Sequence, residues 1–451
     1  MPPSNMPRRS FLLAASTTPI FGSGLRLATF SADITPPLGS PIYTGAARSI
    51  ADPLEARGIV LSGSSKPVVI AILDWCEVRN NSYDLWRSEI AAAAGTTPAR
   101  VLLSCVHQHD APYTDIEAQQ LLDEVRSPYK LCDPEFERAC ITKVTQAIRR
   151  AAPQTITHFG TGQATVEKVA SNRRVVRPDG KISYGRTSAT PDPAIRNQAE
   201  GLVDPTLRTI SFWKGTKPVA ALHAYSTHPM SYYGNGDVSA DFPGIARRKL
   251  QAESPDVFHI YCSGASGDTM AGRYNDGNPA NRRILAGRLH QAMAAAWSAT
   301  ERAPLTRIGF RSAKAMFQPR KDQRYSLEEL NRVLASGSAP RREKLDAALG
   351  ISWLRRIGLR RPIEVPAVHF GSAAIVVVPA EAFVQYQLWA QEAAPKTRVM
   401  TLGYGECAPG YIPTNAAVAE GYGDHYSWVD FATCEATLRN AINEVLNPPL
   451  M

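Results

Sequence analysis

The 451-residue sequence lacks the features that mark a membrane protein or a nucleic-acid-binding protein. After residue 24, no apolar stretch is long enough to cross a bilayer, so no transmembrane segment is expected. Lysine tracts and basic stripes with interleaved aromatic residues are absent, so nucleic acid is not expected as a partner. The formal net charge of +9 is modest for this length, and it is compatible with an anionic substrate or surface.

The sequence also lacks paired cysteines, internal repeats and a clear interdomain linker. Its seven cysteines are scattered, and none forms a Cys-x-x-Cys pair, so no disulfide framework is expected. Hydrophobic residues make up 44% of the chain and charged residues 20%, which is typical of a globular protein with a substantial core.

Residues 1–24 resemble a twin-arginine export signal. Arg8 and Arg9 precede a short apolar run rich in small residues at 11–15. Such signals export proteins that are already folded. We therefore expect an exported protein, periplasmic or extracellular. Polar residues and a proline at 17–19 interrupt the apolar run, so a degenerate leader or a misplaced start is the alternative.

After the leader, apolar runs of strand length alternate with segments of helical periodicity. The expected strands lie at 58–61, 67–73, 101–106, 207–213, 217–225, 256–262 and 373–378. The expected helices lie at 82–94, 134–151, 281–297 and 431–446. This alternation predicts an α/β fold with mixed β-sheets covered by helices, in a single large domain over residues 25–451.

Between about residues 319 and 363 the composition becomes basic, and leucine and valine recur at helical spacing. We interpret this segment as a helical insertion. Its arginines are expected to form a solvated surface rather than a binding site; they include Arg355, Arg356, Arg360 and Arg361.

The strand expected at 101–106 leads directly into His107, Gln108 and His109. On a strand, side chains two residues apart share a face, so the two imidazoles are expected to point the same way. Two imidazoles at a strand end suit a metal site. The alternative is one ordinary core histidine and one solvated histidine.

Three further strand ends carry polar residues. His228 follows the strand at 217–225, and a loop of glycines and serines at 263–269 follows the next strand. Such a loop either lets backbone N–H groups approach a ligand or is simply a tight turn. Glu381 follows the strand at 373–378, where it is either a ligand or a first-turn glutamate favoured by a helix dipole.

Two imidazoles and one carboxylate, from His107, His228 and Glu381, form a set that zinc can use. Three protein ligands leave one coordination position open for water, which is typical of hydrolytic zinc. Zinc lowers the pKa of that water to about 7, so hydroxide forms near neutral pH.

These motifs together resemble the catalytic, N-terminal part of the neutral (non-lysosomal) ceramidases, zinc amidases that cleave the N-acyl bond of ceramide. The His-x-His-x-x-Pro at 107–112 is similar to that family's His-Thr-His-Ser-Gly-Pro, and His228-Pro229 resembles its second histidine motif. Asn172-Arg173 is similar to an Asn-Arg pair that lines its substrate site. Pro379-Ala380-Glu381 resembles its Pro-Gly-Glu, and 410–414 resembles its Tyr-Ile/Val-Thr-Thr.

The resemblance implies a role for each matched residue. The implied zinc ligands are His107, His228, Glu381 and Tyr411. His109 is implied as a proton shuttle or as a hydrogen-bond donor to the substrate oxyanion, and Arg173 as a substrate contact. The further immunoglobulin-like domain of the family is not expected in this chain.

The loop at 267–271 departs from the family pattern. The family has Gly-Asp-Val-Ser-Pro there, with its serine assigned as nucleophile, and this chain has Gly-Asp-Thr-Met-Ala. Met270 takes the place of the serine, and Thr269 comes one residue early. Asp268 and Thr269 remain candidate catalytic residues, Asp268 chiefly as an organiser of the glycine loop. Attack by activated water is therefore favoured over a serine mechanism.

The sequence thus predicts a zinc-dependent hydrolase that cleaves an amide (N-acyl) bond of a small-molecule or lipid substrate. One alternative is a zinc esterase or deacylase that acts on a small or sugar-linked acyl group. Another is a non-catalytic binding protein that has lost the serine. The other histidines are interpreted as structural; they are His158, His223, His259, His290, His369 and His425.

Overall fold

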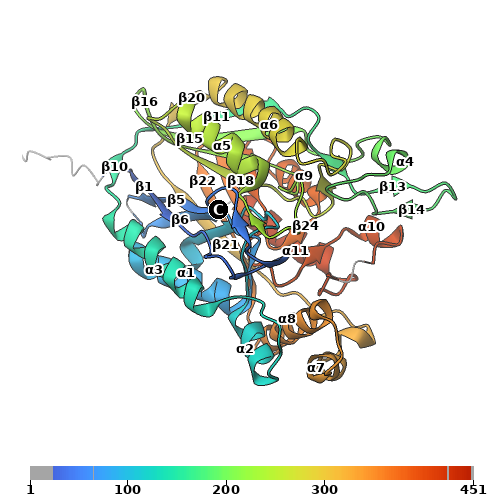
Figure 1. Cartoon of the computed structure of the whole chain (residues 1–451). Coiled ribbons are helices and arrows are strands. Elements are labelled where there is room, and N and C mark those ends of the chain that lie inside the picture. Colours follow the sequence, from blue (N-terminus) through green and yellow to red (C-terminus); the bar gives the residue numbers. More distant parts are fainter. Residues whose placement is uncertain (1–23, 64, 424–425, 448–451) are drawn as a thin grey trace, which may run out of the picture.

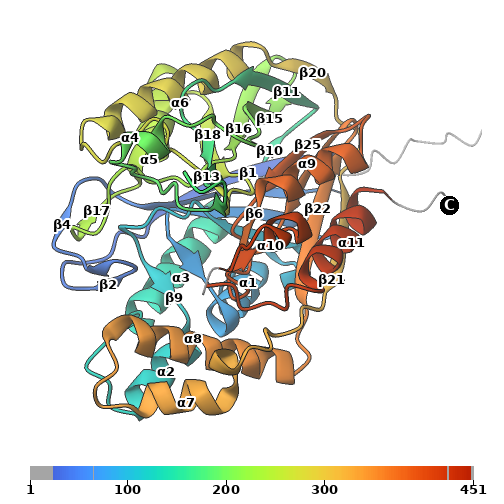
Figure 2. The same cartoon turned by 90° about the vertical axis from the view of Figure 1, so that its right-hand side faces the viewer.

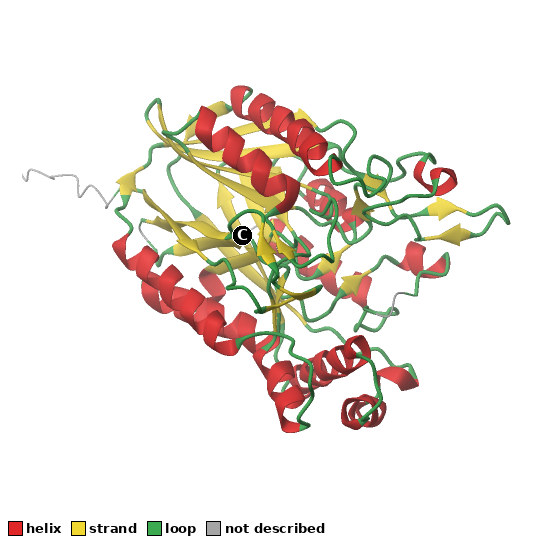
Figure 3. Cartoon of the chain, viewed as in Figure 1, coloured by secondary structure: helices red, strands yellow, loops and turns green. Residues whose placement is uncertain are grey.

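The structure is a computed structural model that describes residues 24–63, 65–423 and 426–447 (Figure 1). Apart from Gly24, the predicted leader lies outside the described residues, and so does His425. Three β-sheets form the centre of the described chain, with helices outside them (Figure 3).

Each of the three sheets is mixed and carries one parallel pair of strands at an edge. The first has the order β10-β1-β5-β6-β8, with β10 (Gln154–Thr155), β1 (Arg26–Asp33), β5 (Glu55–Ser62), β6 (Val68–Leu73) and β8 (Val101–Cys105). The second has the order β18-β16-β15-β11-β20, with β18 (Phe258–Ser263), β16 (Lys217–Tyr225), β15 (Thr206–Lys214), β11 (His158–Thr165) and β20 (Glu301–Pro304). The third has the order β21-β22-β23-β25, with β21 (Gly309–Ala315), β22 (Ile363–Phe370), β23 (Ala373–Val377) and β25 (Arg398–Leu402).

The parallel pairs are β6–β8, β16–β18 and β23–β25, and the other neighbouring strands in these sheets are antiparallel. The α/β class with mixed sheets is therefore confirmed. Twelve two-residue strands, described as pairs, complete the β-structure: β2 (Pro41–Ile42) with β3 (Gly45–Ala46), β4 (Ser49–Ile50) with β17 (Asp237–Val238), β7 (Glu77–Val78) with β9 (Tyr113–Thr114), β12 (Ser171–Asn172) with β19 (Thr269–Met270), β13 (Val175–Val176) with β14 (Ile182–Ser183), and β24 (Glu381–Ala382) with β26 (Tyr411–Ile412).

Burial on both faces explains why the sequence of β6, Val-Val-Ile-Ala-Ile-Leu, is apolar throughout. Every residue of β6 is buried, and successive side chains point to opposite faces of the sheet. Its first, third and fifth side chains pack in a core shared with the second and third sheets. The second, fourth and sixth pack in a separate core with α1 (Asn80–Ala94) and α3 (Pro134–Arg150).

Helices cover the outer faces of the other sheets as well (Figures 1 and 2). The helices α5 (Asp241–Glu253) and α6 (Asn281–Ser298) pack on the second sheet. The helices α9 (Val384–Ala393) and α11 (Cys434–Leu446) pack on the third. The short helices are α4 (Pro193–Arg196), α10 (Asn415–Ala419), η1 (Pro98–Arg100) and η2 (Gln323–Tyr325).

The segment interpreted as a helical insertion contains α7 (Leu327–Ala335) and α8 (Arg341–Gly358), which follow β21 and precede β22. The helix α8 packs against α7 and α2 (Ile116–Glu124), and the three form a group to one side of the sheets (Figure 2). Arg356 does not belong to a solvated surface: it is 7% exposed, and its Nη1 lies 2.9 Å from Asp84 Oδ2. Arg355, Arg360 and Arg361 are exposed, as predicted.

The seven cysteines all lie in the described part of the chain, where each is buried and free. Among the described helices, none combines the length and apolarity that a membrane crossing requires.

A buried carboxyl, that of Glu137 on α3, joins α3 to α1. It accepts hydrogen bonds from Ser82 Oγ at 3.1 Å and from Trp86 Nε1 at 3.0 Å. Burial raises the pKa of Glu137 to about 7, although these donors act in the opposite direction. The folded protein therefore holds a proton on Glu137 at pH values where the unfolded chain does not.

We predict that Glu137→Gln makes the stability of the protein less dependent on pH. Because the folded pKa is raised, the wild-type contribution is favourable below the unfolded pKa and is lost as the pH rises to about 7. Relative to wild type, the variant should gain on the order of 2–3 kcal/mol in unfolding free energy between pH 4.5 and pH 8. Urea unfolding of both proteins at several pH values measures this gain. A constant difference between them across this range would contradict the assignment.

Candidate metal and active site

The carboxyl ends of the three parallel strand pairs meet at one place. Gly403, just after β25, donates its N–H to Ser263 O at the end of β18 (2.8 Å), and Ser263 Oγ donates to Val106 O just after β8 (2.7 Å). Cys105 N at the end of β8 donates to Tyr404 O (2.9 Å). In sheets with parallel strands, ligands bind outside the carboxyl ends, and here three such ends are joined directly.

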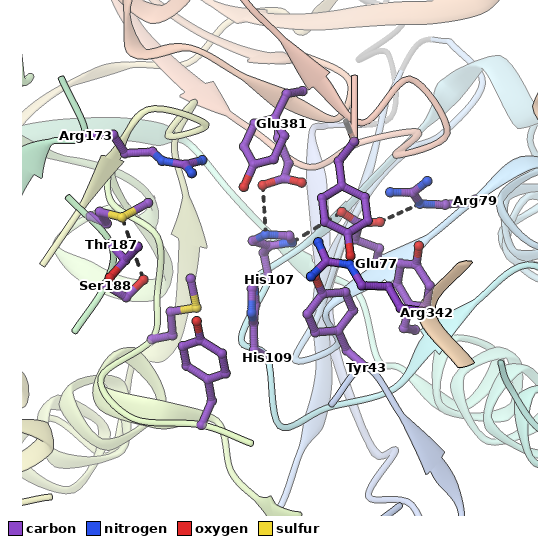
Figure 4. Close-up of a pocket in the computed structure, with 16 residues that line it drawn as sticks. Tyr43, Glu77, Arg79, His107, His109, Arg173, Thr187, Ser188, Arg342 and Glu381 are labelled. Atoms are coloured by element: carbon purple, nitrogen blue, oxygen red, sulfur yellow. Dashed lines mark hydrogen bonds and ion pairs between the residues drawn. The ribbon is translucent and has the colours of Figure 1, made fainter. Parts of the chain in front are cut away.

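His107, His228 and Glu381 converge there, and all three are at least 94% buried. Glu381 Oε2 lies 2.9 Å from His228 Nε2. It lies 3.3 Å from His107 Nε2, a contact that Figure 4 shows. Two ligand atoms on a tetrahedral zinc ion are separated by about 3.3 Å, given bonds of about 2.0 Å. The spacing of these three atoms therefore matches a shared cation.

The contacts of Nδ1 in each of the two histidine rings show where the ring proton lies. His107 Nδ1 lies 2.9 Å from the carbonyl oxygen of Cys76, and His228 Nδ1 lies 2.6 Å from that of Ser266. A carbonyl oxygen only accepts, so each Nδ1 carries a proton and each ring turns its Nε2 toward Glu381. Two lone pairs and a carboxylate repel one another unless protons or a metal ion lie among them.

Without a cation, a proton on His107 relieves this repulsion. Burial acts to lower the pKa of His107, but Glu381 raises it above its usual value. Burial likewise acts to raise the pKa of Glu381, but His107 and His228 beside it hold that pKa well below its ordinary value. Glu381 is therefore a carboxylate, the form that a metal ion requires.

A second group of possible ligand atoms consists of Cys76, His107 and His109. This group is less suited to a metal because His107 Nδ1 is already engaged with the backbone of Cys76. Burial also raises the pKa of the Cys76 thiol well above its usual range, and the nearby carboxylates add to the effect. A protonated thiol is a poor ligand.

The backbone around the converging ligands is held in an unusual conformation. His107, Ala380 and Tyr404 have φ values of 76°, 57° and 56°, in the left-handed region that residues other than glycine seldom adopt. The Tyr404 ring stacks on the His107 ring with centroids 4.0 Å apart. The expectation that His107 and His109 share a strand face is wrong, because β8 ends at Cys105. The loop still brings their rings to a centroid separation of 5.1 Å.

Tyr411 reaches the site through strand pairing. It lies opposite Glu381 in the parallel pair β24–β26, and its ring centroid is 6.4 Å from that of His228. Gly267 lets the glycine loop pack closely against the backbone of Glu381, because a Cβ there would lie 2.1 Å from the Glu381 carbonyl oxygen.

His109 and Arg173 line a cavity of about 350 Å³ beside the converging ligands, on two of its sides (Figure 4). His109 is 8% exposed, and its Nδ1 has no hydrogen-bond partner among the described residues. Burial lowers the pKa of His109 well below its usual value, and the adjacent imidazoles add to the effect. The guanidinium carbon of Arg173 lies 5.3 Å from the Tyr411 ring centroid.

Asp268 and Thr269 do not line this cavity. Asp268 accepts hydrogen bonds from Val384 N (2.7 Å) and Asn172 Nδ2 (2.8 Å), and thus holds the glycine loop against α9 and β12. Burial raises its pKa to about 6. Thr269 Oγ1 faces Ser226, whereas the Met270 side chain lines the cavity.

Several lining residues were absent from the sequence-based set. They include Tyr43, Glu77, Arg79, Tyr113, Arg342 and Tyr426. Glu77 and Arg79 form a buried ion pair, Nε to Oε2 2.5 Å, shortly after β6 ends. The sequence signal that could have identified this pair is its position as polar residues just after the apolar strand β6. None of the histidines interpreted as structural lines the cavity in the part of the chain that is described. His223 and His259, for example, bond to each other inside the second sheet, 2.9 Å apart.

Comparison with solved structures shows which proteins share this fold. The chain has the fold of the neutral ceramidases. The crystal structure of neutral ceramidase from Pseudomonas aeruginosa superposes with a TM-score of 0.67 and 16% identity, over 95% of this chain and 76% of that one. A ceramidase complexed with C2 superposes with a TM-score of 0.68 and 15% identity, over 94% and 75% of the two chains. No protein-family model and no curated protein sequence matches this chain.

We predict that Gly267→Ala destabilises the protein because its Cβ would overlap the Glu381 backbone, with nothing flexible to give way. The expected loss is on the order of 1–3 kcal/mol in unfolding free energy. Gly287→Ala is the matched control: it lies within α6, where a Cβ meets nothing within 4 Å. The control should gain about 0.5–1 kcal/mol. Equal effects of the two variants in urea unfolding would refute the close-approach argument.

Proposed function

We propose that this protein is a zinc-dependent hydrolase that cleaves an amide (N-acyl) bond. One observation carries the proposal: Nε2 of His107, Nε2 of His228 and Oε2 of Glu381 converge at the carboxyl ends of three parallel strand pairs. The ceramidase fold supports the amide-hydrolase class.

The residues present fit a zinc ion on chemical grounds. Imidazole nitrogen and carboxylate oxygen are ordinary zinc ligands, and both imidazoles are oriented by backbone carbonyls in the way that metal-bound histidines usually are. Tyr411 would be the fourth protein ligand, since its strand pairing places it opposite Glu381. A bound zinc ion would polarise the scissile carbonyl and activate water for the attack.

The surrounding residues of this chain would perform the remaining steps. His109 is buried beside the ligands and is held largely neutral, so it can accept a proton from the attacking water and pass it to the leaving amine. Arg173 would orient the substrate from the opposite side of the cavity (Figure 4). Because Met270 has no hydroxyl, the side chain at this position cannot form an acyl-enzyme, which favours direct hydrolysis.

The two other hypotheses make different predictions for the same site. A zinc esterase or deacylase would share the ligands and differ only in substrate preference. A non-catalytic binding protein would hold the metal, or lose it, without hydrolysing any acyl compound. Metal analysis and turnover must therefore be measured on the same preparations.

We predict about one zinc ion per wild-type chain by elemental analysis, and none in His107→Ala or His228→Ala. The two variants each remove one of three converging donors, so affinity should fall by several orders of magnitude. His290→Ala is the control, because His290 on α6 pairs with Glu253 on α5 and does not line the cavity. Full zinc stoichiometry in either ligand variant would disprove the ligand assignment.

We predict that His109→Gln retains zinc but loses most of its turnover on an N-acyl substrate. A proton-transfer group typically contributes about 10²–10⁴-fold to the rate, so kcat should fall by that factor. Parallel zinc analysis separates this outcome from metal loss. If His109→Gln hydrolyses the substrate at the wild-type rate, the proton-transfer role is wrong, while the ligand assignment remains testable as above.

A further inference from the structure

A second large cavity is lined by close sequence neighbours of residues that line the first. Asn172 and Arg174 line it on either side of Arg173, and Phe383 lines it two residues after Glu381. Its volume is about 480 Å³, and among the described residues it shares no lining residue with the cavity of the candidate active site. We call it the α9–α10 cavity, because side chains of both helices line it.

Aromatic rings line the α9–α10 cavity and are fixed by contacts outside it. The ring of Trp389 on α9 is covered by the Arg439 guanidinium, 4.4 Å from its centroid, and meets the Tyr386 ring edge-on at 5.3 Å. Neither of these two partners lines the cavity. Tyr184 likewise makes an edge contact with Tyr422, with centroids 5.1 Å apart. Because these rings are already held, a ligand that packs on them orders little additional side-chain structure.

The charged side chains of this cavity are engaged with one another or with the backbone. Glu420 accepts two hydrogen bonds from Arg174, at 2.6 and 2.8 Å. Glu435 accepts one from the backbone N–H of Asn415 at 2.6 Å. Asp268 accepts the two hydrogen bonds already described. The cavity therefore does not depend on a charged ligand to pair its own charges, and it suits an uncharged ligand.

Two side-chain amides complete the polar lining, those of Gln385 and Asn415. Within the described chain, neither amide takes part in a hydrogen bond. An amide both donates and accepts, whereas the carboxylates beside it only accept. A matching ligand must therefore present groups that can do both. Hydroxyl groups can, but an anion only accepts and an ammonium group only donates.

A sugar ring combines the properties that this lining requires. Its C–H faces pack on the negatively polarised faces of aromatic rings, and its hydroxyls donate and accept at its edge. The cavity volume also lies within the range of about 300–1,000 Å³ that is usual for small-molecule sites.

We propose that the α9–α10 cavity binds a small uncharged saccharide, with a sugar ring against Trp389 and hydroxyls on Gln385 and Asn415. This site is separate from the candidate active site, and the inference does not rest on the proposed hydrolase function.

The test measures saccharide binding to the purified protein by calorimetry and by saturation-transfer difference NMR. The saccharide probes are methyl β-D-glucopyranoside, methyl β-D-galactopyranoside, methyl N-acetyl-β-D-glucosaminide, maltose and cellobiose. Two compounds serve as comparisons. Sorbitol has the hydroxyls without a ring face, and choline is an organic cation that also packs on aromatic rings.

The variants are Trp389→Leu, Gln385→Ala and Asn415→Ala. Asn415 is exposed, so its truncation tests the site even if Trp389→Leu is unstable. The matched control is Trp213→Leu, which removes another half-buried tryptophan that stacks on Trp297 and does not line this cavity.

We predict that at least one saccharide probe binds with a Kd of about 1 mM or below, more tightly than sorbitol or choline. Added salt should leave this Kd unchanged, because the ligand is uncharged. Trp389→Leu should raise the Kd by about 10-fold or more, and each amide variant by about 3-fold or more. Trp213→Leu and His109→Gln should bind as the wild type does.

Several results would overturn the inference. One is the absence of any saccharide probe with a Kd below about 10 mM. Another is choline binding more tightly than every saccharide, which would indicate a site for organic cations. Binding that His109→Gln abolishes and Trp389→Leu retains would place the saccharide in the other cavity. Equal losses in Trp389→Leu and Trp213→Leu would indicate a general effect on the fold.

Discussion

The candidate site depends on one constraint: the carboxyl ends of three parallel strand pairs are hydrogen-bonded to one another. Ser263 connects two of these ends, because its carbonyl oxygen accepts from Gly403 and its hydroxyl donates to the carbonyl of Val106. Each sheet contributes a different ligand from its own strand end, so none of the sheets could hold the site alone. The same hydrogen bonds satisfy backbone N–H and C=O groups that would otherwise be unpaired where the three sheets meet in the interior.

The backbone that positions the candidate ligands is strained, and the surrounding structure holds it in that conformation. His107, Ala380 and Tyr404 occupy backbone conformations that cost of order 1–3 kcal/mol each, and they persist because hydrogen bonds and packing on every side leave no alternative. The carbonyls of Cys76 and Ser266 fix both imidazoles with Nε2 toward Glu381. The same contacts bring both imidazoles and the carboxylate to one point, which is the geometry that the proposed metal site requires.

Part of this could be predicted from the sequence. Strongly apolar strands such as β6, β8 and β23 were found at nearly their true bounds, and the rule that polar residues after strands form sites identified the converging residues. The strand β11 was missed because its Gly-Thr-Gly-Gln-Ala-Thr stretch is only partly buried and carries little apolar signal. The shared-face argument for His107 and His109 failed because the left-handed turn at His107 is set by tertiary contacts. For the same reason, no local pattern could show that Arg356 is buried or that Arg342 lines the cavity.

The shared fold and the cavity wall carry different information about function. A fold held in common at 16% identity shows a shared arrangement of strand ends and connections, and the function must be argued from the residues that this chain places there. The wall also includes segments apart from the three strand ends: the loop with Tyr43 and the first turn of α8. We expect the selection of a substrate to depend on that wall more than on the candidate metal ligands. The chemistry of bond cleavage is therefore best inferred from the strand ends, and the substrate class from the arginines and tyrosines around them.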